Sequence, residues 1–268
     1  MFGLLCFSKR IAQYLRGLEP DLALKMNFLA FDTSTEVLSI GVAAAAQTLL
    51  HTGAGGAQAS FGLISGVQSL LAQAQTPLAA LDAVVFGAGP GSFTGLRTSC
   101  AVAQGLALGA NVPVLPVNSL LAVAEDARLR CFPQRHAVEV LALLDARMDE
   151  VYSAWFGFSQ GRWRQRSEIR LCKPEQVVVD AAVEVLAGNV FVVYPGRVEL
   201  ALGAAPRPCE AALPSAQALL SLAPQLLQQG LAVPPEQALP LYVRDKVAKT
   251  TAERLQEKAA AASGAAGV

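Results

Sequence analysis

The sequence predicts an α/β protein built from two lobes, and three observations point to that class. Each half of the chain opens with closely spaced β-type segments followed by helical patterns, which suggests a duplicated fold with a cleft between the halves. The first half mixes hairpins with strand–helix crossovers, unlike the strict alternation of a doubly wound dinucleotide fold. A chain of 268 residues is long enough for two lobes with a sizeable core.

We place an N-terminal lobe at 26–117 and a C-terminal lobe at 118–247. Residues 1–25 lack the small-residue cleavage site of a signal peptide, so we expect an extension that lies outside the fold. Residues 248–268 form a low-complexity, alanine-rich tail for which we expect disorder.

Each lobe should contain a short antiparallel meander and several helices. In the first lobe we expect strands at 27–32, 37–46 and 47–51, a helix at 60–75, a strand at 83–86, a helix at 94–109 and a strand at 112–117. In the second lobe we expect a helix from Asn118 or Ser119 to Arg130, strands from Val138 joined by a charged turn at 145–150, a return at 162–171, a short helix near Pro174, a strand at 189–194, a helix at 215–229 and an ordered segment at 239–247.

Composition excludes several classes of function. Basic and acidic side chains balance at 21 each, so no overall field draws the protein to nucleic acid or acidic membranes. A local cluster such as Arg162, Arg164 and Arg166 could contact phosphates, and a solvated strand face is the alternative. The five cysteines lack metal-type spacing, which favours reduced cytoplasmic thiols and no metal or cofactor. No apolar run reaches the ~18–20 residues of a membrane span.

The most informative stretch runs from 83 to 109 (AVVFGAGPGSFTGLRTSCAVAQGLALG) and passes from a strand through glycines into a helix. A helix N-terminus leaves backbone N–H groups free for an anion or a close-packed partner. The hydroxyl of Ser92 or Thr94 could cap this helix. Gly89 and Gly91 allow backbone angles that other residues avoid.

One face of the same helix carries almost no side chains. Ala101, Gly105 and Gly109 recur at every fourth position, although each interior glycine costs roughly 0.5–1 kcal/mol relative to alanine. We expect another backbone to pack closely there, from within this chain or from a partner subunit.

The glycine loop fits neither common phosphate-binding fingerprint. Thr94 stands where the Rossmann pattern needs its third glycine, and the Lys-Ser/Thr pair of a P-loop is missing. An anion-binding loop and a tight structural turn therefore fit equally well. Arg97 is poorly placed for the helix dipole, so we expect a carboxylate or phosphate partner for it. Ser92 is a weak nucleophile candidate, because Pro90 replaces the glycine that a nucleophile elbow needs.

The turn at 32–35 (Asp-Thr-Ser-Thr) also allows two interpretations. Its carboxylate and three hydroxyls could hold a hydrated metal and a phosphate. Alternatively, these side chains bond to their own backbone in an Asx/Thr turn.

Four segments of the chain resemble the bacterial TsaB (YeaZ) family and occur in the same order. They are FLAFDTSTEVLSIGVA, VVFGAGPGSFTGLRTSCAVAQGLALG, LALLDARMDEVY and LPLYVRDKVA. The similarity covers 26–247, and GPGSFTGLR together with DARMDEVY is highly specific to the family. The resemblance implies a two-lobed, duplicated actin-like and sugar-kinase-like (ASKHA) fold. One departure is ASFGL at 59–63, where many members have His-Ser/Thr-x-x-Leu.

The resemblance also implies a function and partners. Such proteins are non-catalytic, activating subunits in making threonylcarbamoyladenosine (t6A) in tRNA. They bind the catalytic paralogue TsaD, the ATPase TsaE joins the pair, and tRNA is reached through the complex. They form homodimers in isolation, and the same two helices would serve both contacts. The interface residues implied here are Leu63, Val67, Leu70, Leu71, Ala101, Gln104, Gly105 and Leu108.

The residues agree with a non-catalytic role. Catalytic paralogues carry a metal-binding His-x-x-x-His on their early helix, and the segment 60–75 has no histidine. We expect no catalytic residue and no metal, only a vestigial nucleotide site. The alternative is a stand-alone nucleotide-binding ATPase or phosphotransferase of this superfamily. The phosphate-like loop residues would be Asp32, Thr33, Ser34, Thr35, Gly89, Gly91, Ser92, Thr94, Gly95 and Arg97.

Overall fold

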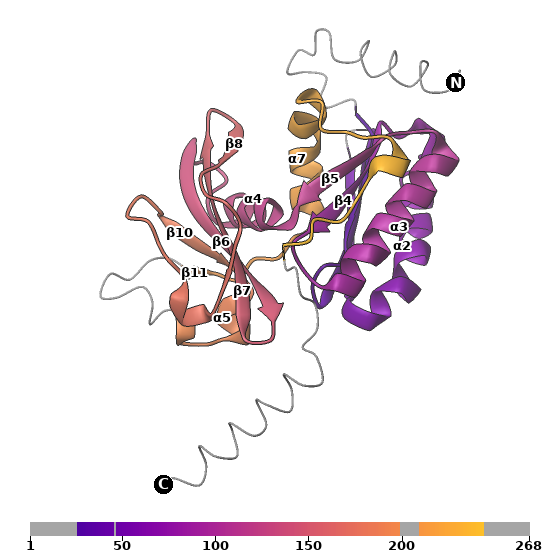
Figure 1. Cartoon of the computed structure of the whole chain (residues 1–268). Coiled ribbons are helices and arrows are strands. Elements are labelled where there is room, and N and C mark those ends of the chain that lie inside the picture. The colour runs from indigo at the N-terminus through magenta and orange to yellow at the C-terminus, as the bar shows by residue number, and fades with distance from the viewer. Residues whose placement is uncertain (1–25, 46, 199–208, 244–268) are drawn as a thin grey trace, which may run out of the picture.

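The structure is a computed structural model that describes residues 26–45, 47–198 and 209–243. The predicted extension at 1–25 and the predicted tail at 248–268 lie outside the described residues. Two β-sheets stand side by side with helix α4 (Ser119–Cys131) between them (Figure 1). The two-lobed α/β class is therefore confirmed. None of the helices within the described residues is long and apolar enough to cross a bilayer.

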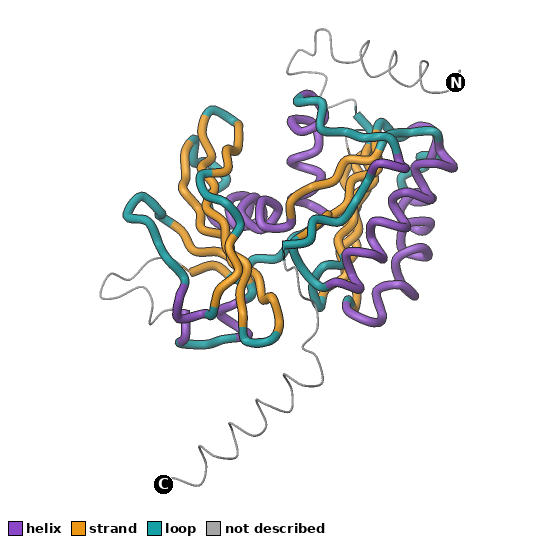
Figure 2. The backbone as a smooth tube through the Cα atoms, in the orientation of Figure 1, coloured by secondary structure: helices purple, strands orange, loops and turns teal. Residues whose placement is uncertain are grey.

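The first lobe is a five-stranded sheet with helices on both faces. Its strands are β1 (Phe28–Asp32), β2 (Val37–Ala44), β3 (Gln47–Ala54), β4 (Ala83–Gly89) and β5 (Val114–Asn118), in the spatial order β3-β2-β1-β4-β5. β1, β2 and β3 form an antiparallel meander, whereas β1, β4 and β5 are parallel. Helices α2 (Ala59–Gln73) and α3 (Phe93–Ala110) cover one face, and α7 (Ala216–Gln228) covers the other (Figure 2).

Strand β1 explains how one sheet serves two cores. Because successive side chains of a strand point to opposite faces, Leu29 and Phe31 enter the core beneath α2 and α3. Phe28 and Ala30 enter the core that contains α4 and α7. Both faces of the strand are buried, which is why its sequence is almost continuously apolar.

The second lobe is a six-stranded sheet built around one long hairpin. Its elements are β6 (Ala137–Arg147), β7 (Glu150–Ser159), β8 (Arg162–Gln165), β9 (Arg170–Cys172), β10 (Val185–Gly188), β11 (Cys209–Glu210) and helix α5 (Val190–Val193). The spatial order is β11-β10-β6-β7-β8, and β9 also pairs with β7. Short 3-10 turns are η2 (Gly56–Gln58), η3 (Leu78–Ala80), η4 (Pro174–Gln176) and η5 (Pro235–Gln237).

The strand predicted at 189–194 is wrong, because α5 occupies most of that range. The preceding strand, β10, ends at Gly188, whose positive φ of 153° turns the chain away from the sheet. The Tyr194 N–H then donates to the Val190 carbonyl at 2.7 Å. A run of β-branched residues is typical of a strand, but here the turn and the burial of Val190 decide the local structure.

The end of the described chain returns to the first lobe, which differs from the division of the chain at residue 118. Helix α7 packs against β1 and β2. Val233 forms an isolated antiparallel bridge with Val114 of β5, and the Leu241 N–H donates to the Ala88 carbonyl at 2.7 Å. In the sequence, the strands of the second sheet are thus inserted between two segments that both belong to the first lobe.

The two lobes share one apolar core that runs through α4 and α7. It contains Ala30 and Val85 from the first sheet together with Val140 and Ala142 from the second. At the start of α4, the Asn118 carboxamide oxygen accepts the N–H group of Leu120 at 2.8 Å. The predicted cap of this helix is therefore confirmed.

The buried carboxylate of Glu125 joins three elements inside this core. It accepts two hydrogen bonds from Arg128, both at 2.7 Å. It also accepts the indole N–H of Trp163 in β8 at 2.8 Å and the hydroxyl of Ser221 in α7 at 2.6 Å. The Arg128 guanidinium lies 4.4 Å from the ring centre of Phe158. A buried ion pair is tolerated when further hydrogen bonds satisfy its atoms, as they do here.

We expect Glu125→Ala to lower the free energy of unfolding by about 3–5 kcal/mol, because it leaves the half-buried Arg128 without its carboxylate. The melting temperature should fall by roughly 10 °C, measured by circular dichroism. The control is Glu168→Ala, which removes an exposed carboxylate and should change stability by about 0.5 kcal/mol or less. Equal losses in the two variants would contradict the network.

Candidate functional site

The turn at 32–35 and the glycine loop meet at the carboxyl ends of β1 and β4. The Ser92 N–H donates to the Ser34 carbonyl at 2.8 Å. The Thr33 hydroxyl donates to the Gly95 carbonyl, in the first turn of α3, at 2.7 Å. The structure therefore brings together the two segments that the sequence proposes as a phosphate-like loop.

Glycines let these two segments touch through their backbones. A Cβ atom added to Gly91 would lie 2.6 Å from the Ser34 Cβ, and one added to Gly95 would lie 1.9 Å from the Thr33 carbonyl oxygen. Gly89 has a φ of 120°, and a Cβ there would meet the Leu241 carbonyl oxygen at 2.7 Å. The space between turn and loop is filled by the chain itself, so the tight structural turn is the interpretation that the geometry favours.

The polar side chains of the turn bond locally. The Ser34 N–H and hydroxyl both donate to Asp32 Oδ1, at 2.8 and 2.7 Å. The Thr35 hydroxyl accepts the N–H of Val37 at 3.2 Å. This is the Asx-turn alternative of the sequence analysis. The described residues contain no cluster of three or more histidine, cysteine or carboxylate side chains that could hold a metal ion.

The second oxygen of Asp32 is in an unusual position. Oδ2 is buried beside Gly87, and it lacks a hydrogen-bond partner among the described residues, as does the buried hydroxyl of Ser119. Burial raises the pKa of Asp32 to about 6, and the hydrogen bonds from Ser34 oppose this rise. The Ser119 hydroxyl is near enough to add a smaller opposing effect, although the two atoms do not meet hydrogen-bonding geometry.

The start of α3 differs from the expectation in two respects. Ser92 is the N-cap residue, but neither it nor Thr94, which is exposed, makes the expected side-chain cap. Among the described residues, Arg97 has aromatic partners and forms no ion pair with a carboxylate. Its Nε donates to the Tyr242 hydroxyl at 3.1 Å, and its guanidinium lies 3.9 Å from the ring centre of Phe93. The sequence could not reveal this contact, because Tyr242 is far away along the chain.

A cavity of about 260 Å³ lies between the lobes. Its walls are the loop at 91–94, the turn at 145–148 and the segment 241–243. The N-terminus of α3, which favours negative charge, lies at one side of this cavity. Arg147 and the carboxylate of Asp145 lie at the other side. Only the loop half of the predicted phosphate site borders this cavity, since the turn at 32–35 is packed beneath the loop.

The turn between β6 and β7 is strained. Arg147, Met148 and Asp149 have φ angles of 61°, 55° and 64°, a left-handed conformation that costs roughly 1–2 kcal/mol for each residue of this kind. The Asp145 carboxylate holds the turn by accepting the Arg147 N–H at 2.8 Å and pairing with its guanidinium at 3.0 Å. Strain of this kind persists only where the surroundings fix the backbone.

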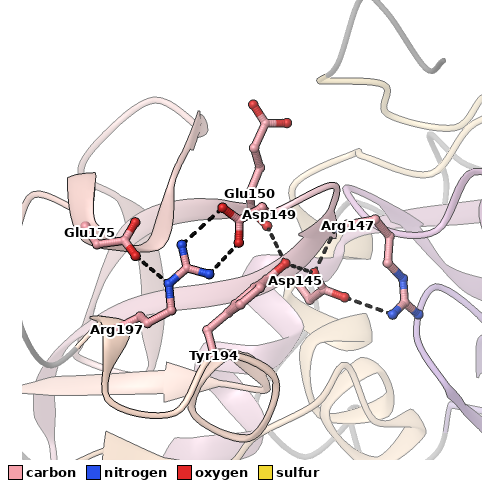
Figure 3. Close-up of polar contacts among 7 residues, drawn as sticks. All are labelled: Asp145, Arg147, Asp149, Glu150, Glu175, Tyr194 and Arg197. Carbon is pink, nitrogen blue, oxygen red and sulfur yellow. Dashed lines mark hydrogen bonds and ion pairs between the residues drawn. The ribbon is translucent and has the colours of Figure 1, made fainter. Parts of the chain in front are cut away.

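Side chains from α5 and its flanks supply those surroundings (Figure 3). The Tyr194 hydroxyl donates to Asp145 at 2.8 Å, and burial together with this bond raises the pKa of Tyr194 to about 12. Arg197 pairs with both Asp149 and Glu175, and its hydrogen bond keeps the pKa of Asp149 below its usual value. The sequence indicated only a charged corner at this turn, because Tyr194 and Arg197 come from a distant segment.

The outer surfaces of α2 and α3 are nearly without charge, and they combine exposed apolar side chains with serine and glutamine. We call this surface the outer helix face and define it by Phe61, Ile64, Ala101, Gly105 and Leu108. Phe61 is 85% exposed, Leu108 72% and Ile64 41%. A Cβ added to Gly105 would meet no atom within 4 Å, and the same is true of Gly109. The sequence analysis left two sources for a backbone packed on this face, the chain itself or a partner subunit. Within the described residues, no backbone of the chain itself packs there.

The predicted interface residues divide between two sides of the helices. Ala101, Gly105 and Leu108 are exposed on the outer helix face, and Gln104 is half-buried with its amide donating to the Ala238 carbonyl at 3.0 Å. The four predicted residues of α2 point into the core, so their assignment to the interface is wrong. They are Leu63, Val67, Leu70 and Leu71.

Phe61 and Ile64 were missed by the sequence reasoning. Their signal is present in the sequence, because both are apolar positions outside the main apolar stripe of α2. The regular stripe marks the face that packs on the helix's own sheet, whereas apolar residues off that stripe mark a surface that remains exposed in the monomer.

The comparisons with known proteins agree with one another. The family model of TsaD, tRNA N6-adenosine threonylcarbamoyltransferase, matches residues 58–194. The tRNA threonylcarbamoyladenosine biosynthesis protein TsaB of Escherichia coli K12 is 34% identical over 229 residues, 83% of this chain and 96% of that protein. The Haemophilus influenzae protein of the same name is 32% identical over 234 residues, 83% of this chain and 95% of its own. The solved structure of YeaZ from Pseudomonas aeruginosa is 38% identical with a TM-score of 0.71, covering 81% of this chain and 100% of that one.

Two sheets that share one core across α4, together with these neighbours, define a two-lobed α/β protein of the actin-like (ASKHA) class. The high coverage of the relatives narrows the class further. The chain belongs to the TsaB (YeaZ) family.

The raised pKa of Asp32 predicts a specific pH dependence. A folded-state pKa of about 6 means that ionised Asp32 destabilises the fold above that pH, and stability from this group rises as pH falls from about 6 to about 4. Asp32→Asn should be more stable than the native chain by up to about 3 kcal/mol at pH 7.5 and about equally stable at pH 4. Urea unfolding at both pH values measures this, with exposed Asp180→Asn as the control. A gain in stability from Asp32→Asn that is the same at both pH values would contradict the assignment.

Two glycines of α3 should respond in opposite ways to the same substitution. Gly95→Ala places a Cβ against the Thr33 carbonyl and should cost more than about 2 kcal/mol, because backbone must move. Gly105→Ala meets no atom and should stabilise by about 0.5–1 kcal/mol through helix propensity. Thermal unfolding of both variants distinguishes a packed glycine from an open one, and a stable Gly95→Ala protein would refute the turn–loop contact.

Proposed function

We propose that this chain is a non-catalytic, activating subunit in the formation of threonylcarbamoyladenosine in tRNA, and that it docks on a catalytic TsaD-type relative. The relatives from E. coli and H. influenzae are named for this biosynthesis, and the family model that matches residues 58–194 is that of the transferase. We expect the protein to work in the cytoplasm, where tRNA is modified.

The outer helix face is the observation that supports docking most directly. Helix α2 contains no charged residue, and α3 contains only Arg97. A helix face that remains in water normally carries charged side chains. Exposed apolar side chains flanked by alanine and glycine instead allow the backbones of two helices to approach closely, which favours a helix-to-helix interface.

The non-catalytic part of the proposal rests on what fills the site. The turn at 32–35 and the loop pack directly against each other through Gly91 and Gly95, so no space remains between these two segments for a phosphate. Helix α2 also has no histidine with which to build the metal site of a catalytic paralogue. The proposed contribution is therefore binding energy and positioning.

The same face would serve more than one partner. In isolation it would pair two copies of the chain in a homodimer, and in the complex it would bind the TsaD-type subunit. The ATPase TsaE and the tRNA would then be reached through that complex. The stand-alone ATPase alternative has no comparable observation in its favour.

Gly105→Leu should abolish the complex with the catalytic relative. The new side chain projects from the outer helix face and blocks close approach, while no atom within 4 Å of its Cβ is disturbed. Co-expression of both full chains followed by mass measurement of the purified species tests this. We expect a one-to-one complex for the native chain and separate proteins for the variant.

Gln217→Leu is the matched control, because it adds the same side chain to an exposed position of α7 on the other side of the sheet. This variant should keep the complex. A complex that tolerates Gly105→Leu would move the interface elsewhere. A catalytic relative that modifies tRNA at full rate without this chain would refute the proposed function itself.

A further inference from the structure

Basic side chains are concentrated on one edge of the second lobe. Although the whole chain is neutral, five of the eleven lysines and arginines in the described ranges lie between residues 162 and 173. Glu168 is the one carboxylate within that segment. The described part of the first lobe, up to residue 117, holds only Arg97. The local field at this edge is therefore positive in a chain without net charge.

The strand register arranges four arginines in a row, which we call the basic strip: Arg162, Arg164, Arg166 and Arg170. Directly opposite residues of an antiparallel pair point to the same face, so these side chains follow every second residue of β7. Successive positions lie about 7 Å apart, comparable to successive phosphates along one nucleic-acid strand. The opposing positions are Arg162–Ser159, Arg164–Gly157, Arg166–Trp155 and Arg170–Ser153.

Three of the four arginines are available to a ligand. Arg166 pairs with Glu139 at 3.0 Å, lying across β7 where Gly157 has no side chain. Arg162, Arg164 and Arg170 are exposed, and none forms an ion pair with a carboxylate of the described chain. The intervening Trp163 points the other way, into the shared core, which fixes the direction of its neighbours.

Protection of the sheet edge does not account for the strip. Charged side chains on an edge strand prevent pairing with another chain, and β8 is an edge strand. A single charge is enough for that purpose, whereas unpaired like charges along one face repel one another. A row of charges of one sign along a sheet edge complements a linear polyanion, and arginine forks match phosphate oxygens in geometry.

We propose that the basic strip contacts the phosphate backbone of tRNA while the chain is docked on its catalytic partner. This inference rests on the proposed function, from which the polyanion takes its identity. The strip lies on the second lobe, and the outer helix face lies on the far side of the first lobe, so both surfaces are open at the same time (Figure 1). The contact supplies affinity and orientation without reading bases.

The test uses the purified complex of the full chain with its catalytic relative and unmodified tRNA. Binding is measured across about 50 to 200 mM salt for the native chain and for the combined variant Arg162→Gln, Arg164→Gln and Arg170→Gln. We expect the slope of log affinity against log salt to become shallower by about 2–3, and the affinity at about 100 mM salt to fall tenfold or more. The mass of the protein complex should not change.

The matched control removes the same net charge elsewhere, through Gln217→Glu, Gln228→Glu and Gln229→Glu on α7 and its C-cap, and should keep the native slope. An intact complex whose variant retains the native slope would overturn this inference alone. A variant that loses binding to phosphatidylserine vesicles but not to tRNA would assign the strip to a membrane surface and also overturn it. Failure of the native chain to form the complex, seen before tRNA is added, would refute the proposed function and this inference with it.

Discussion

The contact between the turn at 32–35 and the first turn of α3 positions the rest of the first lobe. The Thr33 and Ser34 carbonyls approach Gly95 and Gly91 so closely that no side chain fits between them. Two hydrogen bonds, from Ser92 N–H and from the Thr33 hydroxyl, complete the contact, and each contributes about 1 kcal/mol. The direction of α3 follows from this contact, and so does the position of its outer surface. No space for a ligand remains between the turn at 32–35 and the glycines of the loop.

The glycines of α3 are therefore of two physically different kinds. Gly95 is required by a backbone that lies against it, and its cost in helix propensity is offset within the monomer. Gly105 and Gly109 meet nothing within 4 Å, so the monomer offers no compensation for their cost. The proposed docking of a partner helix would supply that compensation, and Leu108, which lies between the two glycines, is likewise exposed. The proposed interface would therefore account for two glycines whose cost the isolated chain does not offset.

Local patterns of the sequence predicted most of the fold, since the strands, the long helices and the Asn118 cap depend on nearby residues. Errors occurred where a nearby turn or a distant residue overrides the local pattern. The segment 190–193 is helical because Gly188 turns the chain and Val190 is buried, despite its β-branched composition. Arg97 finds its partner 145 residues away, at Tyr242. The four misplaced interface residues of α2 have a different cause: the regular apolar stripe marks the face that packs on the helix's own sheet, whereas the exposed apolar residues Phe61 and Ile64 lie outside that stripe.

The two lobes divide the chemistry of the surface between them, and the shared core fixes their relative position. The first lobe exposes an uncharged helix face, whereas the second lobe exposes unpaired arginines. Glu125 of α4 accepts hydrogen bonds from Trp163 of β8 and from Ser221 of α7. Strand β8, where the basic strip begins, is therefore connected to α7, the helix that packs on the first sheet. A partner on one lobe and a polyanion on the other would consequently be held in a defined geometry. A subunit without chemistry of its own can accelerate a reaction by such positioning, because fixing the relative orientation of two reactants removes much of the entropic cost of their encounter.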